Sequence, residues 1–141
     1  MGDVVYEAHT AIYNRLNTAS VTGLLEAGSS GIHWPSAPAT RTWPYLLIEC
    51  LDAAERDRTF EAATWTEQIW SITGVTVEDA PAASAIAYAV HQRLELAELT
   101  ISGYRNLCCF RRRAKQPRPV IGEDGVLRFH AGAEYTIGVA I

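Results

Sequence analysis

One segment, residues 64–97, reads TWTEQIWSITGVTVEDAPAASAIAYAVHQRLELA and joins a strand pattern to a helix pattern. Up to Val77 it is rich in β-branched and aromatic residues, which favour strands. Asp79 is then placed as a helix N-cap, and Pro81 stands in the first helical turn, where its missing N–H costs least. Apolar residues recur beyond it at helical spacing, at positions 83, 86, 87, 90, 94 and 97. We therefore predict a strand followed by a helix that packs on it.

Patterns on both sides of this segment predict the other elements. Residues 3–17 carry an apolar stripe at helical spacing, with Asp3 placed to cap the helix. Residues 45–51 are a continuous apolar run, typical of a strand covered on both faces. Residues 99–110 predict a further strand in which Gly103 marks a bulge or a close backbone approach. Residues 126–141 alternate and predict the last strand.

The expected order is helix, strand, strand, helix, strand, strand in a single domain over residues 1–141. This order favours an α+β fold, an antiparallel-rich four-stranded sheet with two main helices packed on one face. Charged residues 52–63 would then form a hairpin tip that projects into solvent. On the uncovered face, Trp65 or Trp70 would expose an apolar patch of the kind that marks partner surfaces.

The composition is that of a globular protein. Of the 141 residues 48% are hydrophobic and 20% are charged, and the net charge of −4 argues against a surface that coats nucleic acid throughout. The amino-terminal residues lack an export signal, and the longest apolar run is far shorter than the roughly 18 residues of a membrane span. We expect a soluble protein made in the cytoplasm, with its three cysteines as buried free thiols.

No pattern in the chain indicates catalysis. The four histidines show no metal-ligand spacing, and CxxC, HExxH and phosphate-loop motifs do not occur. Carboxylates in residues 52–61 alternate with Arg56 and Arg58, which favours a solvated hairpin over a cation site. We expect no enzyme activity, no metal and no cofactor.

Two segments call for a role outside the core. Residues 28–42 form a long loop with several prolines, and Trp34 and Trp43 in and beside it need partners. Residues 111–118, RRRAKQPR, carry five basic side chains and begin what reads as a linker before the last strand. Three interpretations of these side chains remain open: they contact DNA phosphates, they pair with acidic groups of a partner protein, or they are simply solvated.

Several landmarks together resemble one protein family. They are GIHWP at 31–35, WPYLLIE at 43–49, the Trp-bearing strand, the Ala-rich helix and ISGY at 101–104. In this order they resemble the tail terminator, or tail-completion, proteins of long-tailed bacteriophages over nearly the whole chain. The basic residues 111–118 have no counterpart in that resemblance.

The resemblance implies a non-enzymatic virion protein. Such a subunit forms a ring, commonly a homohexamer, that caps the head-proximal end of the tail tube, stops its polymerisation and provides the joining surface to the neck. Its implied partners are further copies of itself, the tail tube protein and a neck or head-completion protein, with non-specific contact with DNA in the channel as a further option. Its implied location is the virion tail, and the host cytoplasm during assembly.

Capping a polymer requires interfaces, and aromatic and arginine side chains dominate interface energies. The partner-interface candidates from the sequence are Trp34, Trp43, Arg56, Arg58, Phe60, Trp65, Trp70, Arg111, Arg112 and Arg113. The alternative functions are a head-tail joining protein of the neck, a small DNA-binding accessory protein that uses the arginine run, and a small hydrolase or ligand-binding domain around His33.

Overall fold

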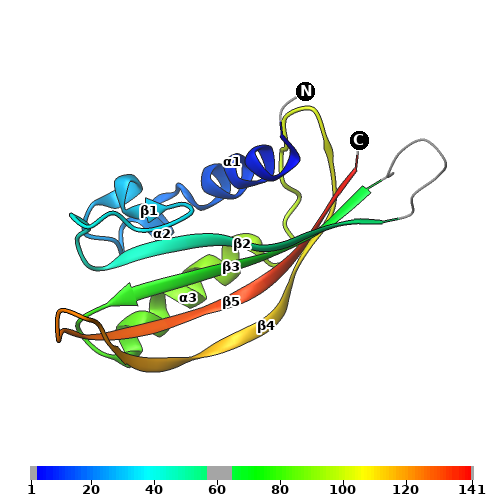
Figure 1. Ribbon diagram of the computed structural model, residues 1–141. Coiled ribbons are helices and arrows are strands. Elements are labelled where there is room, and N and C mark those ends of the chain that lie inside the picture. The colour runs from blue at the N-terminus through cyan, green and yellow to red at the C-terminus, as the bar shows by residue number, and fades with distance from the viewer. Residues whose placement is uncertain (1–2, 57–64, 141) are drawn as a thin grey trace.

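The computed structural model describes residues 3–56 and 65–140 (Figure 1). Its elements in chain order are α1 (Val4–Leu16), α2 (Ala19–Thr22), the 3₁₀ helix η1 (Gly28–Gly31), β1 (Ile32–His33), β2 (Tyr45–Arg56), β3 (Trp65–Thr76), α3 (Ala80–Leu94), β4 (Arg105–Ile121) and β5 (Leu127–Ala140).

The strands form one mixed sheet in the order β1-β2-β3-β5-β4. The four long strands are antiparallel, and the short β1 runs parallel to β2 because Ile32 and His33 pair with Leu46 and Leu47. The α+β class is confirmed. The predicted count of four strands was wrong, since the described part of the chain contains five.

Both helix starts match the sequence prediction. Asp3 Oδ1 accepts hydrogen bonds from the backbone N–H groups of Val5 and Tyr6, each at 3.0 Å. Asp79 Oδ1 accepts from Ala82 N at 2.8 Å. Each carboxylate satisfies backbone donors that have no partner inside the helix, which typically contributes about 1 kcal/mol to stability.

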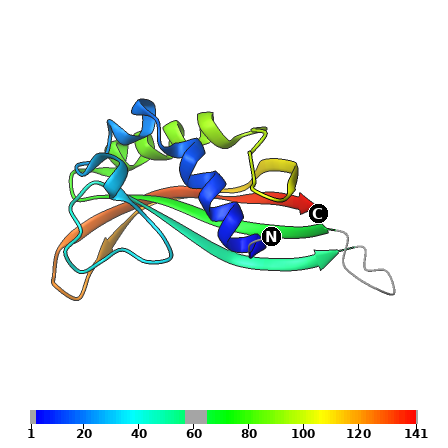
Figure 2. The same cartoon turned by 90° about the horizontal axis from the view of Figure 1, so that it is seen from above.

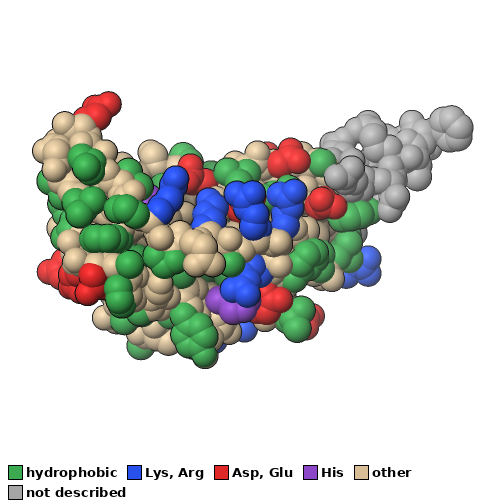
Figure 3. All heavy atoms as spheres, turned by 90° about the horizontal axis from the view of Figure 1, so that it is seen from below, with side chains coloured by type: hydrophobic (Ala, Val, Ile, Leu, Met, Phe, Trp, Pro, Cys, Tyr) green, Lys and Arg blue, Asp and Glu red, His purple; other side chains and the backbone are tan. Residues whose placement is uncertain are grey.

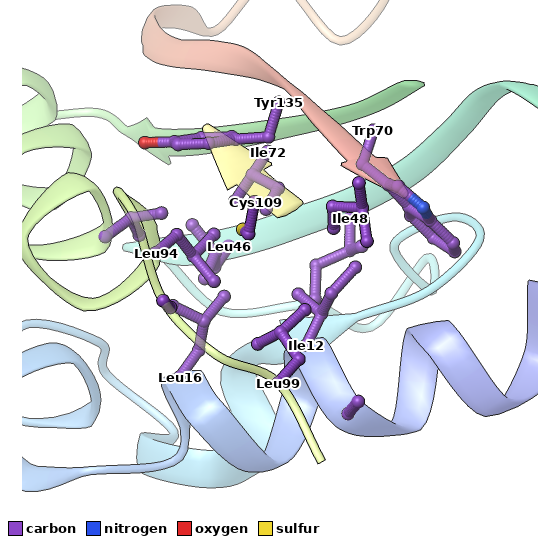
Figure 4. Close-up of a cluster of buried hydrophobic side chains, with 14 of the residues drawn as sticks. Ile12, Leu16, Leu46, Ile48, Trp70, Ile72, Leu94, Leu99, Cys109 and Tyr135 are labelled. Atoms are coloured by element: carbon purple, nitrogen blue, oxygen red, sulfur yellow. The ribbon is translucent and has the colours of Figure 1, made fainter. Parts of the chain in front are cut away.

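The helices lie on one face of the sheet and cover the core (Figure 2). Ile12 and Leu16 of α1 and Leu94 of α3 have no measurable exposure, and they meet apolar side chains that rise from the strands (Figure 4). The strands supply Leu46, Ile48, Trp70, Ile72, Tyr135 and Ile137 to this core. Burial of one such side chain is worth about 1.5–3 kcal/mol, so this contact holds the two layers together.

Trp70 lies on the helix-covered face and not on the open face predicted for it. Its side chain is fully buried, and its indole N–H donates to Gln68 Oε1 at 2.9 Å. Trp65 is five residues away along β3, so it faces the opposite side of the sheet, where it is half-buried. The prediction of Trp70 as a partner contact was therefore wrong, because period-2 alternation does not say which face the helices cover.

The third long strand, β4, also differs from its prediction. Residues 99–104 are not a strand, and Gly103 stands in a turn with φ of 79°. The strand starts at Arg105 and continues through the basic residues to Ile121, pairing with β5 along its length. The segment interpreted as a linker is thus an edge strand. The predicted hairpin tip also changes, since β2 continues to Arg56 and residues 57–64 lie outside the described residues.

Candidate partner interface

The basic side chains of residues 111–118 line one edge of the sheet. β4 is the last strand in the sheet order, and the part from Arg111 to Arg118 is exposed except for the half-buried Lys115. Seen from this side, Lys and Arg side chains stand in a row along the molecule (Figure 3). We call this surface the basic edge; its residues are Arg111, Arg112, Arg113, Lys115 and Arg118.

Part of the charge on the basic edge is paired inside the chain. Glu134 of β5 accepts from Arg112 Nη1 at 3.4 Å and lies 3.2 Å from Arg113 Nε. The Glu134 side chain is 8% exposed, whereas the two arginines are 54% and 72% exposed. Lys115 Nζ donates to Ser71 Oγ at 2.6 Å. Glu95, whose Oε2 accepts from Arg111 N, is a second carboxylate at this edge, and two carboxylates against five cations leave the surface positive.

The backbone of β4 is poorly suited to pairing with a further strand. Glu95 Oε2 accepts from Arg111 N at 2.7 Å, and Leu96 N donates to Cys109 O at 2.8 Å, so the residues after α3 occupy part of this edge. Farther along, Pro117 and Pro119 lack an N–H. Prolines, basic side chains and bulges are the features that protect natural edge strands from strand addition. A partner therefore meets this edge through side chains.

Apolar side chains flank the basic edge at both ends. Leu96 is 81% exposed, and Leu107 and Phe110 are 46% and 39% exposed at the start of β4. At the other end, Ile121 is 72% and Leu127 is 45% exposed. Exposed apolar side chains beside a positive surface give a partner protein area to bury, whereas a nucleic acid backbone offers them little to bury against.

A small cavity of about 260 Å³ opens on the sheet face opposite the helices, next to the basic edge. Lys115, Arg118 and His130 line it together with Glu49 and apolar residues of β2 and β3. Burial lowers the pKa of His130, and the charges of Arg118 and of other nearby basic residues lower it further. Two cations and one carboxylate, Glu49, are among the residues that line the cavity, so its wall is positive on balance.

The two loop tryptophans lie elsewhere and already have partners within the chain. The Trp34 ring stacks on His9 of α1 with centroids 4.1 Å apart. Trp43 lies between two guanidinium groups, with Arg41 at 5.5 Å and Arg128 at 5.2 Å from its ring. Each pairing fixes the long loop to the body of the protein, and each ring keeps part of its surface exposed.

The structure therefore gathers Arg111, Arg112 and Arg113 on one edge and leaves Trp34 and Trp43 away from it. Arg58 and Phe60 lie outside the described residues, and Arg56 ends β2 with a side chain that is also outside them. The sequence interpretation missed Glu134. Its signal was a charged residue inside the alternating apolar pattern of β5, on the side opposite Tyr135.

Within residues 3–56 and 65–140, no group of three or more His, Cys, Asp or Glu side chains is arranged to hold a metal ion. None of the helices described there is long and apolar enough to cross a membrane. The three cysteines are free thiols, and burial, the main cause, raises the pKa of Cys109 to about 12.

No protein-family profile matches the sequence, and no curated protein matches it. Solved structures do share its fold. One is a chain of the virion of a native gene transfer agent particle, with 18% identity, a TM-score of 0.67 and coverage of 100% of both chains. A second, described only by a sequence identifier, has 14% identity and a TM-score of 0.63, with coverage of 99% of this chain and 98% of that one. The chain as a whole therefore has the fold of a chain found in a gene transfer agent virion.

Proposed function

We propose that this chain is a structural virion protein that forms a ring on the head-proximal end of a tail tube. The ring would stop tube polymerisation and present the surface to which the neck joins. The observation that carries the proposal is the full-length likeness in fold to a chain of a gene transfer agent virion. The sequence resemblance to tail terminators supplies the finer assignment to the end of the tube.

The surface of the chain suits this role. A subunit that ends a polymer has to bind the last ring of the tube and withhold the surface on which another tube subunit would add. The basic edge, with its exposed side chains and blocked backbone, offers contacts without offering a strand edge. The role needs no catalysis, so we propose that the protein is not an enzyme.

The test combines assembly and capping. We expect the purified chain to form rings, either outright or as its concentration rises, measured by native mass spectrometry and negative-stain microscopy. Tube protein polymerised with the chain present should give shorter tubes, each with added density at one end. Tubes of unchanged length with bare ends would contradict the capping role. Binding only to an isolated neck complex would instead favour a head-tail joining protein.

A further inference from the structure

The two edges of the sheet carry opposite charge. The basic edge on β4 holds five cations. Within the described residues two carboxylates contact it: Glu134, which pairs with two of its arginines, and Glu95, which accepts from Arg111 N. On the other side of the sheet, β1 covers only the start of β2, and residues 48–54 beyond it contain neither Lys nor Arg. Glu49 there faces the cavity that Lys115 and Arg118 also line, so Asp52 is the exposed carboxylate of this part of β2. The first residues of α1 add further carboxylates there.

Helix α1 lies beside the β2 edge (Figures 1 and 2). Residues 3–10 contain Asp3 and Glu7 and no basic side chain. Tyr6 is 55% exposed, and Leu51 on the β2 bulge is 52% exposed. We call this surface the acidic edge; its residues are Asp3, Tyr6, Glu7, Leu51 and Asp52.

The acidic edge is shorter than the basic edge. Because β1 pairs with Leu46 and Leu47, residues 48–56 of β2 remain at the edge and run for roughly 30 Å, whereas the 17 residues of β4 run for roughly 55 Å. A strip about 30 Å long and 15–20 Å wide has roughly 450–600 Å², and the neighbouring surface of α1 extends it toward the roughly 800 Å² that one partner contributes to a stable protein interface. Both strips also combine exposed apolar residues with their charges, which gives the contact area to bury.

We infer that the basic edge of one copy of this chain binds the acidic edge of a second copy, so that copies join head to tail through side chains. This inference rests on the proposed ring, because it names the surfaces that would build it. The two surfaces differ, so the contact is heterologous, and repeating it closes a ring when the rotation between copies allows. Opposite charges at the two edges disfavour the reversed arrangements, in which like edges would meet.

A charge swap tests the inference. One variant, Arg111→Glu with Arg118→Glu, makes the basic edge more acidic, and the other, Glu7→Lys with Asp52→Lys, makes the acidic edge basic. Arg111, Arg118 and Asp52 are exposed and Glu7 is half-buried, and thermal unfolding verifies that each variant folds. We expect each variant alone to associate at least about tenfold more weakly than the unmodified chain in sedimentation velocity at matched concentration. The control is Glu78→Lys, an exposed change on neither edge, which should associate like the unmodified chain.

Mixing the variants gives the decisive result. The two carboxylates introduced on β4 in one variant can pair with the two lysines introduced on the acidic edge in the other, so an equimolar mixture should recover association with the two variants alternating. Association of the unmodified chain should also weaken as the salt concentration rises from about 0.05 to 0.5 M. Variants that associate normally, a mixture that fails to recover, or an unmodified chain that stays monomeric throughout would each overturn the inference.

The same variants separate this inference from the proposed function and from DNA binding. Normal association of both variants, together with tube capping by the unmodified chain, would overturn the edge contact and leave the capping role in place. Absence of capping by the unmodified chain would count against the capping role itself. Loss of duplex DNA binding in the Arg111→Glu, Arg118→Glu variant, with association unchanged, would assign the basic edge to DNA and overturn the inference.

Discussion

Replacing Gly74 by alanine should force α3 away from the sheet. Gly74 of β3 faces the helices, and a Cβ added there would lie 2.6 Å from Ile86 Cγ2 and 2.9 Å from Ile86 Cβ. Carbon atoms in contact are normally about 3.5–4.0 Å apart, so the helix must shift by nearly 1 Å or Ile86 must leave its rotamer. Overpacking of this size destabilises the folded state by about 1–3 kcal/mol. Alanine also has less conformational entropy than glycine in the unfolded chain, which offsets roughly 0.4–1 kcal/mol of that loss. We expect a net destabilisation of about 1.3 kcal/mol, the difference between the middle values of these two ranges.

A double-mutant cycle tests this reasoning. Ile86 is 2% exposed, so Ile86→Ala alone should cost about 2–5 kcal/mol. Because that change removes the methyl group that the new Cβ meets, the double variant should be about 1–2 kcal/mol more stable than the sum of the two single changes predicts. Urea unfolding followed by circular dichroism gives all four free energies of unfolding.

The control pairs Ile86→Ala with Gly138→Ala. A Cβ at Gly138 meets the Cys108 side chain at 3.0 Å and is not in contact with α3, so these two changes should be additive. Additivity of Gly74→Ala with Ile86→Ala to within about 0.5 kcal/mol would refute the close approach of α3 to β3 at this position.

Three further changes probe the sheet and its surroundings. Glu134→Gln should lower the free energy of unfolding by about 1 kcal/mol, because it removes the negative charge that pairs with Arg112 and Arg113. This loss of stability should become smaller when the salt concentration rises from about 0.05 to 0.5 M, and an equal loss at the two salt concentrations would contradict the ionic cause. Burial and nearby cations hold the pKa of His130 below its unfolded value of about 6.5, so acidification protonates the unfolded chain first and stability is lost as the pH falls from about 7.5 to 5.5. His130→Asn should therefore reduce the change in the free energy of unfolding between about pH 7.5 and 5.5, measured by urea unfolding at each pH. An unchanged pH dependence would contradict the assignment of this effect to His130. Cys109, buried with a pKa raised to about 12, should resist alkylation at pH 8 until urea unfolds the chain, as peptide mass mapping would show; rapid native labelling would place it at the surface.

The sequence correctly predicted the elements that are specified by residues close together in the chain. The helix over residues 80–94 was confirmed to within a few residues, because its N-cap, its proline and its apolar spacing lie within the same short segment. The strand before it was confirmed for the same reason. The predicted caps at Asp3 and Asp79 both form the expected hydrogen bonds.

The edge strand could not be predicted in this way. Residues 111–121 have basic side chains and two prolines, a composition that favours a loop when it is considered alone. They form a strand because β5 offers backbone partners along its whole length. Proline lacks an N–H, and an edge strand tolerates this because one of its sides has no neighbouring strand to receive that hydrogen bond. The candidate interface depends on this result, since the strand holds the basic side chains in one row.

By itself, the sequence determined the α+β class, the order of the main elements and the residue types available for contact with partners. The tertiary structure alone decided that Trp70 faces the helices, that Glu134 pairs with Arg112 and Arg113, and that the basic residues 111–118 lie in one edge strand. The physical reason is that caps and periodicity act over a few residues, whereas strand order and the choice of the covered face depend on pairing between segments distant in the chain.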